Sequence, residues 1–180
     1  YQASIVITPQ QEADMDIKAT LNNLLIPYTS NYAGTLLPGI REYTVTPGEK
    51  TTTISGKGKA GLKQEENYYF FYLPVCYKGI TGKSYAYYNT SRSKNLYLPA
   101  SVDENYSYDI QLPENLTLCT PIQEKKIDNP IGSFKITLTS EGSSLHIELA
   151  LQIKKQLITP AEYPAFRSLI TEWTDRTRKP

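Results

Sequence analysis

Strict alternation of apolar and polar residues is clearest near the C-terminal end of the chain. Phe134, Ile136 and Leu138 alternate with polar residues, and a polar turn follows at residues 141–144. The alternation then resumes with Leu145, Ile147, Leu149, Leu151 and Ile153. Because successive side chains of a strand point to opposite faces, this pattern predicts a β-hairpin whose apolar face forms the spine of the core.

Shorter runs predict further strands along the rest of the chain. Residues 13–21 alternate in the same way, and residues 4–8 form a short apolar run. The aromatic run at residues 68–74 is typical of a strand that is covered on both faces, so we expect it to be central. The remaining predicted strands are two edge strands at residues 43–45 and 51–54, and two strands at residues 95–98 and 106–112 that end at prolines.

The apolar spacing changes after the last strand. Residues 159–162 (Thr-Pro-Ala-Glu) have the form of a capping box with proline at the first helical position. Apolar residues then recur at helical spacing, at Tyr163, Phe166, Leu169 or Ile170, and Trp173. We therefore expect one C-terminal helix over about 160–176. A start at Pro164, after a separate turn, is the alternative, because proline lacks the amide hydrogen that an interior helical position needs.

Together these elements predict a mainly β fold: an antiparallel β-sandwich with one C-terminal α-helix. A chain of 180 residues can bury one substantial core, but it is short for two full domains. Residues 56–180 are predicted to form the sandwich and its helix. Residues 1–55 hold several prolines and glycines, and they are interpreted as an N-terminal β segment that either completes the sandwich or forms a separate small unit.

The charge pattern argues against nucleic acid as a partner. The 19 basic and 18 acidic residues nearly balance, and lysine and arginine are scattered. A phosphate backbone binds surfaces on which positive charge is concentrated. No apolar run approaches the length of about 20 residues that spans a bilayer, so we also expect no membrane span.

Cys76, Cys119 and His146 are the residues from which a cysteine-dependent enzyme would have to be built, with Asp103 or Asp109 as the orienting carboxylate. His146 lies between two inward positions of the predicted hairpin, so it is expected to face solvent. Neither cysteine opens a helix, where a thiol pKa is commonly lowered. We therefore predict that the chain is not an enzyme. The two cysteines are either buried thiols or one disulfide between neighbouring strands.

No motif for a metal or a cofactor stands out, and we expect neither. One histidine and two distant cysteines do not reproduce zinc-ligand spacing, and no aspartate-rich calcium loop is present. The glycine-rich residues 56–61 lack the Gly-Lys-Ser/Thr ending of a phosphate loop. The remaining candidates for ligand or partner contact are aromatic residues on either side of the turn at 79–83, namely Tyr77, Tyr85, Tyr87 and Tyr88.

Several features resemble a known bacterial family in their order along the chain. They are Gly-Lys-Gly-Lys-Ala-Gly at 56–61, the aromatic run closing in Leu-Pro at 73–74, an arginine before Leu-Pro at 98–99, Tyr-x-Tyr-x-Ile-x-Leu-Pro at 106–113, residues 129–134 before the hairpin, and Pro-Ala-Glu-Tyr-Pro-Ala-Phe-Arg at 160–167. This series is similar to the domain of unknown function that follows the transglutaminase-like core in large exported bacterial proteins.

The resemblance implies a β-sandwich with a terminal helix, placed after a papain-like catalytic domain and itself without catalytic residues. It implies an accessory role, in which the domain docks on or positions the transglutaminase/protease-like domain of the same polypeptide, outside the cytoplasm, in the periplasm or at the cell surface. The alternative is a carbohydrate- or cell-surface-binding module that uses exposed tyrosines to bind a glycan or a surface protein.

Overall fold

A computed structural model describes residues 12–22, 37, 39–71, 73–76, 79–80, 91–119 and 123–174 of the chain. Its elements follow the chain in this order: β1 (Glu12–Asn22), β2 (Ile40–Pro47), β3 (Thr51–Gly61), β4 (Lys63–Glu65), β5 (Tyr68–Phe70), β6 (Leu96–Tyr97), β7 (Val102–Gln111), β8 (Gln123–Asn129), β9 (Gly132–Glu141), β10 (Ser144–Ile153), β11 (Leu157–Ile158) and α2 (Tyr163–Thr174).

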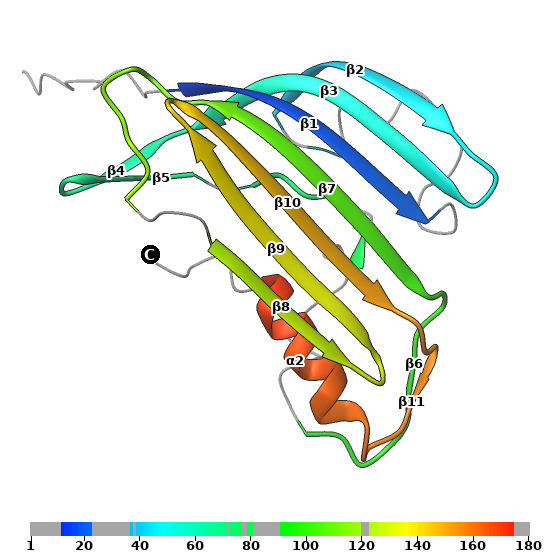
Figure 1. The fold of residues 1–180 in the computed structure, drawn as a ribbon. Helices are drawn as coiled ribbons and strands as arrows, with labels where there is room; N and C mark the ends of the chain where they lie inside the picture. The colour runs from blue at the N-terminus through cyan, green and yellow to red at the C-terminus, as the bar shows by residue number, and fades with distance from the viewer. Residues whose placement is uncertain are drawn as a thin grey trace, which may run out of the picture.

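One large antiparallel sheet organises the molecule. Its seven strands run in the order β2-β3-β1-β7-β10-β9-β8 (Figure 1). Strand β1 pairs with β3 on one side and with β7 on the other, so the first described strand lies inside the sheet. Two small sheets, β4–β5 and β6–β11, lie at the ends of this large one. The strands of residues 12–61 and those of residues 102–153 thus share one sheet.

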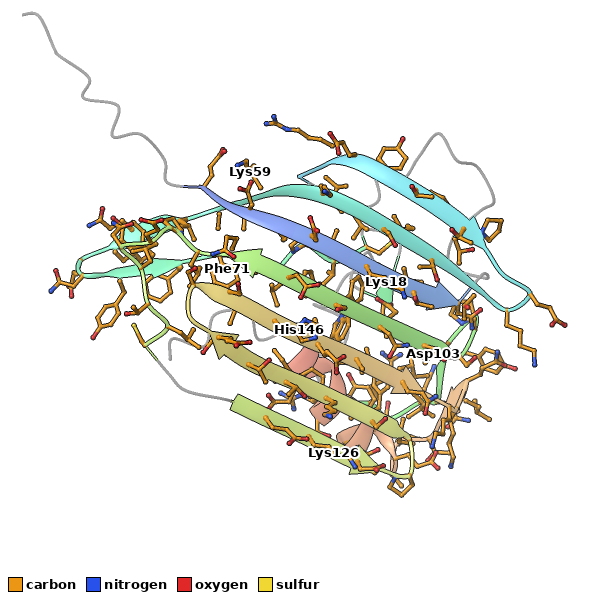
Figure 2. All side chains as sticks on the ribbon, turned by 45° about the horizontal axis from the view of Figure 1, so that its top comes forward. Lys18, Lys59, Phe71, Asp103, Lys126 and His146 are labelled. Carbon is orange, nitrogen blue, oxygen red and sulfur yellow. The ribbon has the colours of Figure 1, made fainter. Side chains whose placement is uncertain are left out.

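The two faces of the large sheet differ in polarity, as the alternation of the sequence requires. On β10, the side chains of Leu145, Ile147, Leu149, Leu151 and Ile153 are buried, while the residues that alternate with them, mostly polar, are partly or fully exposed. The same pattern holds on β1 and β7. Figure 2 looks onto the polar face, with α2 behind the sheet. We call this the outer face; the apolar side is the inner face.

Helix α2 covers part of the inner face. Its five buried side chains, Tyr163, Phe166, Leu169, Ile170 and Trp173, match the predicted apolar stripe. The Trp173 ring packs 5.9 Å from the ring of Tyr106 on β7 and 6.4 Å from that of Phe134 on β9. These aromatic contacts fix the helix to the sheet.

The predicted capping box is present at the start of the helix. The Glu162 carboxylate accepts hydrogen bonds from the backbone amide and the hydroxyl of Thr159, at 3.1 and 3.0 Å. A bond from Lys155, together with those from Thr159, lowers the pKa of Glu162 to about 2. Residues 160–162 form a turn, and regular helix begins at Tyr163. Pro164 therefore lies in the first turn, where its missing amide hydrogen has no consequence.

The predicted fold class is confirmed: the chain is mainly β, with a large antiparallel sheet and a C-terminal helix. The 134–153 hairpin is confirmed as β9 and β10, which pair antiparallel on either side of the predicted turn, with Glu141 opposite Ser144. The predicted strand at 51–54 is longer than expected, and its predicted edge position was wrong, because β3 lies between β2 and β1. Of the two predicted edge strands, β2 alone lies at an edge of the large sheet. The predicted strand at 4–8 lies outside the described residues.

The prediction for the aromatic run at 68–74 was wrong. Of the described residues of this run, only Tyr68–Phe70 are in a strand, and that strand pairs with β4 in a two-stranded hairpin instead of lying in the centre of the large sheet. Tyr69, Phe71 and Leu73 pack against the core, whereas Tyr68 is 51% exposed. The run therefore has the sequence pattern of a strand covered on both faces, but the described part of the chain covers one face of the hairpin.

Candidate functional site

The residues of a cysteine-dependent site lie on opposite sides of the large sheet. His146 is on the outer face of β10, as predicted, beside Asp109 of β7. Cys76 is completely buried on the inner side, where its backbone amide donates to the hydroxyl of Tyr106 at 3.0 Å. The sheet therefore separates the Cys76 thiol from the imidazole. Cys119 is exposed, and both thiols are free, so the disulfide alternative is not formed.

His146 is held between two carboxylates. Its Nδ1 lies 2.7 Å from Oδ1 of Asp109, and its Nε2 lies 3.7 Å from Oε1 of Glu148. The hydrogen bond to Asp109 raises the pKa of His146 above its ordinary value of 6.5, against the opposing effect of burial. The nearby hydroxyl of Ser144 donates to Oε1 of Gln111 at 2.9 Å, so it is not directed at the imidazole as a nucleophile would be.

A shallow hollow surrounds this pair on the outer face. It measures about 690 Å³ and is open to solvent. Its walls come from β1, β7, β10 and β9, and they carry the carboxylates of Asp14, Asp16, Asp109 and Glu141. Lys59 pairs with Asp14 across the β1–β3 ladder. The hollow is thus an open depression with mixed polar and apolar walls and several acidic groups, and it does not enclose a small molecule as a ligand pocket does.

Among the described residues, no group of three or more histidine, cysteine or acidic side chains is arranged to hold a metal ion. Within the same ranges, no helix is long and apolar enough to cross a membrane. The four predicted contact residues, Tyr77, Tyr85, Tyr87 and Tyr88, lie outside the described residues.

A buried polar cluster beneath the sheet was not predicted from the sequence. Glu104 is fully buried on the inner face of β7. Its Oε1 accepts from the amide of Ile80 at 2.5 Å, and its Oε2 accepts from the hydroxyl of Tyr106 at 2.9 Å. A Cβ atom on Gly79 would lie 2.8 Å from the carboxyl carbon, so any other residue there would displace the Glu104 carboxyl. We call Cys76, Gly79, Ile80, Glu104 and Tyr106 the Glu104 cluster.

The Glu104 cluster joins the segment at residues 73–80 to the sheet. Burial, followed by the nearby charge of Glu104, raises the pKa of Tyr106 well above 10, so its hydroxyl stays protonated and remains a donor. Tyr108, on the same strand, donates to the carbonyl of Pro74 at 2.8 Å. A glutamate among inward positions of a strand, in the series Val102, Glu104, Tyr106, is the sequence signal that could have revealed the cluster.

Comparison with solved structures gives one relevant similarity. A protein from Parabacteroides distasonis, whose crystal structure is described as that of "a putative protease", is 35% identical over the matched part, with a TM-score of 0.54. The match covers 58% of this chain and 21% of that one, so this chain spans about a fifth of the solved protein. No curated protein matches the chain.

The family comparison covers the C-terminal part of the chain. Residues 67–180 match the model of a family described as a domain of unknown function with solved structure, DUF3858. The matched range contains β5 to β11 and α2, and thus the Glu104 cluster and His146. With most of its length covered by this match, the chain belongs to the DUF3858 family.

Proposed function

We propose that this domain is a non-catalytic accessory domain that packs against a transglutaminase/protease-like catalytic domain of the same polypeptide and positions it. The observation that carries the proposal is the similarity to the Parabacteroides protein. There, a region 35% identical to this chain makes up 21% of a longer protein described as a putative protease. The order of motifs in the sequence supports the same placement, after the catalytic domain.

The local chemistry agrees with a supporting role. Cys76 lies in the Glu104 cluster. The backbone amides and the tyrosine hydroxyl around it form the hydrogen bonds that hold residues 73–80 on the sheet. His146 has an orienting aspartate, but the nearby Ser144 hydroxyl donates elsewhere. A domain whose buried carboxyl is bonded by a backbone amide and a tyrosine hydroxyl of its own chain is suited to be a rigid support.

The test is direct binding between this domain and the separately produced remainder of its polypeptide, by calorimetry at moderate salt. We expect a dissociation constant in the micromolar range or below, because a linked neighbour needs only modest intrinsic affinity. No heat of binding at about 100 µM of each partner would refute the docking role.

Two further measurements address the other parts of the proposal. The isolated domain should show no hydrolase activity above that of a Cys76→Ala/Cys119→Ala variant; thiol-dependent activity would make it an enzyme instead. We also propose that the parent protein lies outside the cytoplasm, as the resemblance implies. Cell fractionation that recovers it with cytoplasmic markers would refute this localisation.

A further inference from the structure

The β4–β5 hairpin extends from one end of the large sheet (Figure 1). Its strands pair only three residues each, with Lys63 opposite Phe70 and Glu65 opposite Tyr68. A two-stranded hairpin of this size has little stability of its own in water unless it packs against another surface.

One face of the hairpin is used within this chain. Tyr69, between Tyr68 and Phe70, packs against the core, and its hydroxyl donates to Gln64 at 3.3 Å. Because successive strand residues point to opposite sides, Tyr68 and Phe70 belong to the other face. Tyr68 is 51% exposed and Phe70 is half-buried.

The Tyr68–Phe70 face has the composition of a protein interface. Lys63 and Glu65 are the cross-strand neighbours of the two rings, and they form an ion pair at 3.0 Å with both side chains exposed. Exposed aromatic rings with charged groups beside them are common in sites that bind another protein. We call Lys63, Glu65, Tyr68 and Phe70 the hairpin face.

The hairpin lies where the polypeptide enters the sheet. Glu12, the first residue of β1, is opposite Gly61, the last residue of β3, and β4 begins at Lys63. A domain connected through residues 1–11 would therefore be tethered beside the hairpin face. The β6–β11 sheet also exposes an apolar pair, Tyr97 at 74% and Leu157 at 46%, but it lies at the opposite end of the large sheet (Figure 1).

From this placement we infer that the hairpin face is the docking surface for the domain that precedes residue 12 in the same polypeptide. The inference rests on the proposed function, which supplies that domain. The surface it contacts should be apolar where Tyr68 and Phe70 insert, with polar groups around it that match Lys63 and Glu65. The chain of the Parabacteroides protein is nearly five times as long as the matched part, so that protein has further regions that could carry such a surface.

The test uses the intact polypeptide with a protease site placed within residues 1–11. After cleavage at micromolar concentration, we expect the two wild-type pieces to elute together in gel filtration. The Tyr68→Ser/Phe70→Ser variant should weaken their association at least about tenfold, so that the pieces separate. The matched control is Tyr97→Ser/Leu157→Ser, which removes an equally apolar exposed pair at the far end and should leave the pieces together.

The outcomes separate the two proposals. Separation of the wild-type pieces overturns the docking role and the inference with it. Association of the hairpin variant as tight as wild type overturns the inference alone, as does separation of the control variant.

A second readout needs no substitution at the hairpin. Amide hydrogen exchange at residues 63–70 should be at least about tenfold slower in the intact, uncleaved protein than in the excised domain. Equal exchange rates in the two forms would overturn the inference even if the variant failed to fold.

Discussion

Replacing Tyr106 with phenylalanine removes one oxygen atom and two hydrogen bonds from the Glu104 cluster. The hydroxyl accepts from the Cys76 amide at 3.0 Å and donates to the Glu104 carboxyl at 2.9 Å. A buried hydrogen bond contributes about 1 kcal/mol, and one to a charged group about 1.5–3 kcal/mol. The ring remains in its contacts with Trp173 and Tyr108. We therefore expect Tyr106→Phe to lower the free energy of unfolding by about 2–4 kcal/mol.

The assay is urea denaturation followed by fluorescence. Trp173 is the one tryptophan of the chain, and its ring packs 5.9 Å from that of Tyr106, so the signal comes from the region of the cluster. In a thermal melt, a loss of this size corresponds to a decrease of roughly 5–15 °C for a domain of this length.

Tyr97→Phe is the matched control, because it removes the hydroxyl of a side chain that is 74% exposed. Its effect should stay within about 0.5 kcal/mol. If Tyr106→Phe also changed the unfolding free energy by less than about 0.5 kcal/mol, the claim that the cluster holds residues 73–80 on the sheet would be wrong.

Four further predictions concern single positions. The NMR titration of His146 should give a pKa above 6.5, and this pKa should fall in Asp109→Asn. The stabilisation of the fold by protonated His146 should be complete below a pH of about 6.5 and should be lost as the pH rises through the raised pKa. Unchanged stability over that pH range would contradict a stabilising contact between His146 and Asp109. Thr159→Ala should destabilise the domain by about 1 kcal/mol in a thermal melt while Thr159→Ser retains most of the cap, and equal stability of the two variants would refute the capping role. Stability from Glu162 should be lost as the pH falls from about 4.5 through about 2, measured by acid denaturation against Glu162→Gln, which should lack this transition. Gly142→Ala should lower the free energy of unfolding by roughly 1 kcal/mol in urea denaturation, because φ is +58° there. No atom would meet the added Cβ, so the cost comes from the backbone conformation alone, and a neutral result would show that the turn relaxes.

The parts of the fold that were predictable from sequence are those in which local pattern and final environment agree. The alternation at 134–153 and the Thr159–Glu162 box each specify a conformation within a few residues, and both are present. Strand partners are a different matter, since they depend on segments far apart in the chain. Nothing in residues 13–21 indicates that β1 is central, because that position depends on pairing with both β3 and β7.

The candidate site was predictable only in part for the same reason. The outward position of His146 follows from its place between Leu145 and Ile147, and it separates the imidazole from Cys76. The aspartate that faces it could not be chosen between Asp103 and Asp109 without the register, which places Asp109 directly opposite. The aromatic run at 68–74 misled for a physical reason: its composition is that of a strand buried on both faces, but composition does not determine which strand it pairs with, and β5 pairs with β4 outside the large sheet.

The position of β1 between β3 and β7 has a consequence for how the domain can be divided. The family match begins at residue 67, after β1, β2 and β3. A chain cut there would lose β1, which pairs with β7 on the side away from β10. The backbone groups of β7 that now bond to β1 would then form an open sheet edge. Such an edge, long and next to bare apolar side chains, recruits strands from other molecules. Shortened forms that begin at the family boundary are thus expected to aggregate, whereas those that retain residue 12 onward keep the edge closed.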